Sequence, residues 1–87
     1  MKRDEILRVV EQIICNDRQD VHGNPENTFE LIATYWQTYL RTHITDADVA
    51  VLMALFKIAR LQTNPQHRDN ILDGIGYLAI AGELIDK

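Results

Sequence analysis

The chain has few cysteines, few basic residues and no long apolar run, and each shortage excludes a class of protein. One cysteine among 87 residues cannot form an internal disulfide, which suits the reducing cytoplasm. Nine Lys and Arg against 13 Asp and Glu give a formal net charge of −4, which argues against general binding of nucleic acid through its phosphates. No apolar run reaches the ~18 residues of a membrane span, and the charged start of the chain is not a signal peptide. We therefore expect a cytoplasmic protein with no membrane segment.

What the chain does have is enough apolar material for one globular core. Hydrophobic residues make up 46% of it, which is not the composition of a disordered protein. The length predicts a single domain, residues 1–87. Domains this small bury a smaller fraction of their surface, so a metal, a ligand or a second subunit would help to stabilise the fold.

Apolar residues recur every three or four positions in four segments, and no segment shows the alternation of a half-buried strand. Asn24 and Pro25 are suited to begin one of these helices, and Thr45 with Asp48 forms a capping-box-like start for another. The pattern predicts an all-α four-helix bundle, with helices at about Arg3–Cys15, Pro25–Thr42, Val49–Leu61 and His67–Ile85.

The third predicted helix is apolar nearly all round, so we expect it at the centre of the fold or in a dimer interface. We expect the protein as a whole to be a homodimer or a homotetramer. Cys15, at the end of the first apolar helix, is expected to be buried. The fourth helix holds Gly74, Gly76 and Gly82, each of which costs roughly 1 kcal/mol relative to Ala. These glycines either allow neighbouring helices to pack closely, which is the explanation we favour, or leave room for a ligand.

Charged residues offer two candidate sites. Lys57 and Arg60, three apart on the third helix, share a face. One interpretation is that Lys57 pairs with an acid on a neighbouring helix. The other is that Lys57 and Arg60 together contact a phosphate. The two interpretations are not exclusive. Two acidic pairs, each four residues apart, could converge on Mg²⁺ from two helices, or they could serve helix dipoles and ordinary ion pairs; they are Glu26 with Glu30 and Asp69 with Asp73.

The connection between the first two helices is dense in groups that can bind or orient a ligand. Arg18 could contact a phosphate or pair with a nearby aspartate. His22 could stack on a ligand or transfer a proton near neutral pH, although a loop histidine is more often simply solvated.

Residues 17–29 read Asp-Arg-Gln-Asp-Val-His-Gly-Asn-Pro-Glu-Asn-Thr-Phe. This segment resembles the signature of a small uncharacterised domain of phage and prophage genomes, and the resemblance continues through Trp36 and Lys57–Arg60 to Asp73 and Tyr77. The family carries no established activity. A phage origin would place the protein in the cytoplasm of a bacterial host.

More distantly, the chain is similar to the all-α nucleoside triphosphate pyrophosphatases of the MazG and dimeric dUTPase type. The resemblance implies an oligomeric helical bundle that binds Mg²⁺ and cleaves a nucleotide to a monophosphate and pyrophosphate. Asp73 matches the last acid of the second motif of that family, Glu-x-x-Asp, but Asn70 stands where the motif has Glu. Glu26 and Glu30 only partly match the first motif, Glu-Glu-x-x-Glu.

The first hypothesis is therefore a Mg²⁺-dependent pyrophosphohydrolase-like protein that acts on a nucleoside triphosphate or a related nucleotide. The metal ligands would be Glu26, Glu30, Asp69 and Asp73, and the nucleotide contacts Arg18, His22, Asn27, Lys57, Arg60 and Tyr77. One alternative is a non-catalytic protein that sequesters a nucleotide signal, for which the basic residues matter more than the acids. The other is a helical protein-interaction module that binds no small molecule.

Overall fold

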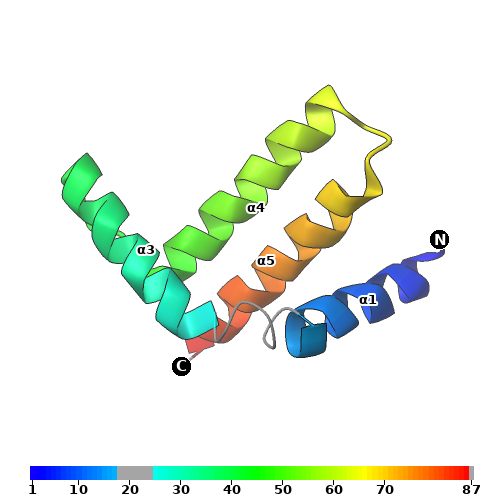
Figure 1. Cartoon of the computed structure of the whole chain (residues 1–87), viewed down its shortest axis with the longest axis horizontal. Coiled ribbons are helices and arrows are strands. Elements are labelled where there is room, and N and C mark those ends of the chain that lie inside the picture. Colours follow the sequence, from blue (N-terminus) through cyan, green and yellow to red (C-terminus); the bar gives the residue numbers. More distant parts are fainter. Residues whose placement is uncertain (18–24, 87) are drawn as a thin grey trace.

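The computed structural model describes residues 1–17 and 25–86, with the backbone alone for Asp17, Pro25 and Glu26 (Figure 1). The all-α prediction is confirmed, because the described residues form four α-helices and a short π-helix and include no strand. The elements are α1 (Arg3–Gln12), η1 (Ile13–Asp17), α3 (Pro25–Leu40), α4 (Asp46–Thr63) and α5 (Arg68–Asp86). Within the described ranges, no helix is both long and apolar enough to cross a membrane.

The centre of the molecule is an antiparallel hairpin of α4 and α5, which run side by side in Figure 1. The predicted capping box begins α4. The hydroxyl of Thr45 accepts a hydrogen bond from the Asp48 N–H at 3.0 Å, and the Asp48 carboxylate accepts one from the Thr45 N–H at 2.9 Å. These two bonds satisfy backbone donors that would otherwise lack a partner, so they fix where the hairpin starts.

Small buried residues let the two helices of the hairpin approach closely. Ala50 and Ala54 of α4 and Ala81 of α5 are almost fully buried. Side chains of α3 complete the cluster from one end of the hairpin. The core consists of Phe29, Ala33, Ile44, Val49, Ala50, Ala54, Tyr77, Ile80, Ala81 and Leu84.

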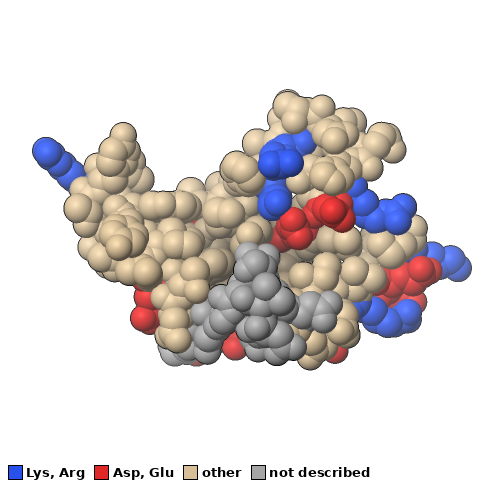
Figure 2. Space-filling model, viewed as in Figure 1, with Lys and Arg blue, Asp and Glu red and all other residues tan. Residues whose placement is uncertain are grey.

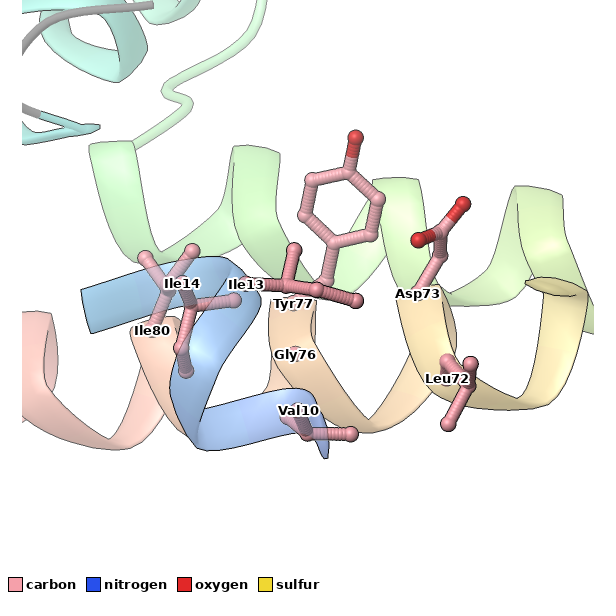
Figure 3. A pocket seen from close by; sticks show the side chains of 8 residues that line it. All are labelled: Val10, Ile13, Ile14, Leu72, Asp73, Gly76, Tyr77 and Ile80. Carbon is pink, nitrogen blue, oxygen red and sulfur yellow. The ribbon is translucent and has the colours of Figure 1, made fainter. Parts of the chain in front are cut away.

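α1 and η1 pack against α5, and Gly76 lies between Val10 and Ile14 in this contact (Figure 3). A Cβ atom on Gly76 would lie 2.9 Å from Cγ2 of Ile14. Close helix packing therefore explains this glycine. The prediction that Cys15 is buried was wrong, because Ile14 faces α5 and the neighbouring Cys15 is exposed.

α3 diverges from the hairpin, so the single chain is more open than a closed four-helix bundle (Figure 1). The helix ends at Leu40 because Arg41 adopts a left-handed conformation, with φ of 57°, while its N–H still donates to the Gln37 carbonyl at 2.8 Å. Along the diverging part of α3, Tyr35 and Tyr39 are exposed. The molecule consequently measures 41 × 29 × 23 Å.

Candidate functional site

The candidate site is built on an ion pair that joins the two helices of the hairpin. Nζ of Lys57 on α4 lies 2.9 Å from Oδ2 of Asp73 on α5, and the two side chains are 18% and 28% exposed. Gly74, next to Asp73, lies beside the lysine stem, and a Cβ there would lie 3.9 Å from the Cβ of Lys57, which is an ordinary contact. Lys57 therefore does pair with an acid on a neighbouring helix, which was one of the two readings of this residue.

The pair fixes a positively charged donor group without using all of its hydrogen-bonding capacity. An ammonium group has three N–H donors, and Asp73 is the one ionic partner of Lys57 among the residues that the structure describes. Partial burial strengthens the interaction of this charge with a nearby anion, because water screens it less than it would at an open surface. The arrangement leaves the ammonium able to donate to a further acceptor.

Arg60 adds a second positive charge one turn further along α4. Its side chain is exposed, and its guanidinium carbon lies 5.7 Å from the centroid of the Phe56 ring. Nζ of Lys57 lies 5.9 Å from the same centroid. Phe56 thus contacts both cations at a distance typical of cation–π interactions. Figure 2 shows the basic and acidic atoms next to one another over the facing parts of α4 and α5.

Phe56 is the residue of this site that sequence reasoning missed. It is half exposed although it is a large aromatic residue. A signal for its role was present, because Phe56 and Arg60 are four residues apart in a helix and therefore lie on the same face.

On α5, Asp73 and Tyr77 point to the same side, toward α4, as Figure 3 shows. Tyr77 is buried, and its ring centroid lies 6.2 Å from that of Phe29 on α3. Asp69, one turn before Asp73, is 74% exposed, and its carboxylate lies 3.7 Å from Nε2 of His67. The structure therefore brings Lys57 and Asp73 together, places Tyr77 in the core one turn from Asp73, and leaves Asp69 at the surface.

The four acids predicted to bind Mg²⁺ do not gather in the described part of the chain. Glu30 lines a shallow hollow of about 470 Å³ between α3 and the start of α4, together with Gln37 and Asp46. The side chain of Glu26 lies outside the described residues. Within those residues, no group of three or more His, Cys, Asp and Glu side chains could hold a metal ion. The four-acid Mg²⁺ site therefore stays a prediction.

A small cavity lies beside the site, between α1–η1 and α5. Its volume is about 10 Å³, which is room for about one water molecule. It is lined by Val10, Ile13, Ile14, Leu72, Asp73, Gly76, Tyr77 and Ile80 (Figure 3). A nucleotide cannot enter this cavity, so the cavity itself is not a nucleotide site.

The remaining predicted contacts lie elsewhere. Asn27 is exposed in the first turn of α3. Arg18 and His22, the candidates from the connection before α3, lie outside the described residues. Their roles stay predictions.

Residues 5–85 match a family described as a domain of unknown function (DUF6378). The gene 55 protein of Mycobacterium phage L5 is 41% identical over 76 residues, which cover 86% of this chain and 49% of that protein. The gene 55 protein of Mycobacterium phage D29 is 39% identical over 84 residues, 97% of this chain and 56% of that protein. The chain thus spans about half the length of these relatives, and no solved structure matches it. The resemblance to an uncharacterised phage domain is confirmed, and the similarity to pyrophosphatases stays a prediction.

Proposed function

The chain belongs to the family of the domain of unknown function DUF6378, and from the geometry of its Lys57–Asp73 ion pair we propose that it binds a phosphate-bearing nucleotide. The binding surface is the side of the α4–α5 hairpin that carries Lys57 and Arg60. The observation that carries the proposal is a mostly buried ammonium, fixed by a carboxylate 2.9 Å away, with an exposed guanidinium one turn further on.

Lys57 is the anchor of the proposed phosphate site. Its ammonium keeps one N–H on Asp73 and donates another to a phosphate oxygen, so binding does not require the ion pair to break. The carboxylate also holds the long side chain in one position, which lowers the entropy lost when the phosphate binds.

Arg60 supplies the second contact. Its planar guanidinium can bind two phosphate oxygens at once, and the Phe56 ring beneath it limits the directions that it can take. In the described part of the chain Arg60 forms no ion pair, so a phosphate would not have to displace a protein carboxylate from it.

Of the two nucleotide hypotheses, we favour binding without cleavage over Mg²⁺-dependent cleavage. Asp73 already pairs with the Lys57 ammonium, and the described acids do not form a group that could hold a metal. Since the relatives are phage proteins, the corresponding role is to sequester a nucleotide signal of the bacterial host.

Mg²⁺-dependent cleavage of a nucleotide to a monophosphate and pyrophosphate is the second candidate. It is favoured by one observation, the position of Asp69 one turn from Asp73 on α5, with its carboxylate mostly exposed. Of the four acids that this candidate uses, the side chain of Glu26 lies outside the described residues, and among the described side chains no three acids gather.

One experiment distinguishes the two candidates. The purified protein is incubated with a mixed nucleotide pool, with and without Mg²⁺, and both the protein fraction and the solution are analysed by mass spectrometry. An intact nucleotide retained with the protein supports binding, whereas monophosphate and pyrophosphate in solution support cleavage. No retention and no products would contradict both.

Arg60→Gln tests the assignment of the site. The variant loses a charged hydrogen-bond donor at an exposed position, so the fold should persist while retention weakens about tenfold. Arg41→Gln is the matched control, because it removes the same charge from an exposed residue at the end of α3. Equal weakening in the two variants would show that net charge, and not the proposed site, governs retention.

A further inference from the structure

The side of the hairpin that faces away from α1 carries an exposed apolar surface. Gly76 of α5 lies against α1, whereas Leu78 lines this apolar surface. The two residues are two positions apart and therefore point about 200° apart around the helix. Leu55, Ile58 and Leu78 are each slightly more than half exposed. We call this surface the apolar stripe, and it comprises Val51, Leu55 and Ile58 of α4 with Ile71, Ile75, Leu78 and Ile85 of α5.

A groove of about 200 Å³ runs between the two helices along this stripe. Its walls are apolar, formed by side chains such as Ile58, Ile71 and Leu78. One polar side chain also lines it: Asn70 is 3% exposed, and its Nδ2 has no hydrogen-bond partner among the described residues. A buried amide without a partner is costly. Because Nδ2 is itself buried, an acceptor could reach it only if the side chains around the groove moved apart.

Gly82 supplies an independent observation. It follows Leu78 by one turn on the same side of α5, and a Cβ placed there would meet nothing within 4 Å. Gly76 and Gly82 thus differ, because Ile14 explains the first and nothing in the described chain explains the second. A glycine inside a helix costs helix stability relative to alanine. Close packing of another helix against this position would offset that cost.

The exposed area of the chain is large for its mass. A folded monomer of 10.0 kDa is expected to expose about 5,200 Å², whereas this chain exposes 6263 Å², an excess of about 1,000 Å². A specific interface of standard size covers about 800 Å² on each partner. The excess, to which the exposed side chains of the diverging α3 also contribute, is of the size that one interface removes.

We propose that a second copy of this chain covers the apolar stripe, so that two α4–α5 hairpins form the core of a two-fold dimer. In such a dimer the same patch is used twice and must be complementary to itself. An uncharged apolar stripe meets that condition, since every stripe residue is apolar and no like charges are brought together. The net charge of −4 per chain lies elsewhere on the surface.

The dimer leaves the proposed nucleotide site open. Lys57 and Ile58 are neighbours in α4 and therefore point about 100° apart. Lys57 pairs with Asp73, while Ile58 lines the groove. The dimer and the nucleotide site are therefore separate proposals, and either one can fail without the other.

Sedimentation equilibrium of the whole chain tests the dimer. The expected mass is twice the 10.0 kDa of one chain. Leu78→Glu introduces a charge into the stripe and should weaken the dimer at least about tenfold. Leu31→Glu is the matched control, because Leu31 is 55% exposed on α3 and Leu78 is 52% exposed on α5. The control should remain a dimer.

Gly82→Leu provides a second variant in case Leu78→Glu does not fold. In a single chain the added side chain enters open space and favours the helix, so circular dichroism should show full helicity. In the dimer it separates the hairpins, so the dissociation constant should rise. A wild-type protein that sediments as a single chain overturns the proposal. So does a folded Gly82→Leu variant that dimerises as tightly as the wild type, or dissociation by Leu31→Glu but not by Leu78→Glu.

Discussion

The two sides of the α4–α5 hairpin differ in whether the chain supplies their partners. On one side Lys57 finds Asp73, and α1 packs over Gly76. On the other side, Ile58 and Leu78 stay half exposed around a groove that contains an unpartnered amide. Packing within one chain accounts for one side of the hairpin, whereas the other side keeps an exposed apolar surface, which we propose a second copy covers.

The largest effect on stability is expected at the ion pair. Asp73→Ala leaves the mostly buried Lys57 ammonium without its carboxylate. The expected loss is about 2 kcal/mol, between the cost of breaking an exposed pair and that of breaking a fully buried one. Urea unfolding at one fixed protein concentration measures it.

Asp69→Ala is the control for that variant. Asp69 lies one turn earlier on α5 and is 74% exposed, so its removal should cost less than about 0.5 kcal/mol. Equal losses of unfolding free energy in the two variants would mean that the Lys57–Asp73 pair contributes no more than a surface charge.

A smaller effect is expected where α1 packs on α5. Gly76→Ala places a Cβ 2.9 Å from Ile14, whose branched side chain has little freedom to move. Overpacking costs typically 1–3 kcal/mol, of which about 1 kcal/mol is recovered as helix propensity, so a net loss of about 1 kcal/mol should appear in thermal unfolding.

Gly74→Ala is the control for Gly76→Ala. The new Cβ would lie 3.9 Å from the Cβ of Lys57, which is an ordinary contact, so this variant should gain up to about 1 kcal/mol from helix propensity. Stabilisation by both substitutions would show that α1 does not pack tightly against α5.

Local sequence rules were sufficient for the start of α4. The Thr45–Asp48 capping box begins α4 as predicted, because its two bonds join residues three apart and need no distant partner. The pairing of Lys57 with an acid on another helix was one of two predicted readings. A charge between Phe56 and Ile58 requires compensation, but the sequence alone does not show which acid provides it.

Tertiary features were beyond those rules. The first predicted helix ends as a π-helix at Ile13–Asp17, where Ile14 packs on α5, and such a change of winding leaves no clear mark in the apolar periodicity. The divergence of α3 and the different reasons for Gly76 and Gly82 depend on which helices meet, which spacing along one helix cannot show.

The most direct test substitutes, in two separate variants, two neighbouring residues that lie on opposite sides of the hairpin. Lys57→Gln and Ile58→Glu are each passed through a sizing column with the nucleotide pool, and the mass and the retained nucleotide are read from the same protein peak. Lys57→Gln should keep the dimer mass and lose the nucleotide, because the amide can still donate to Asp73 but carries no charge. Ile58→Glu should halve the mass and keep the nucleotide. Loss of both properties in both variants, or the reverse assignment of the two, would contradict the claim that the hairpin separates a nucleotide side from a dimer side.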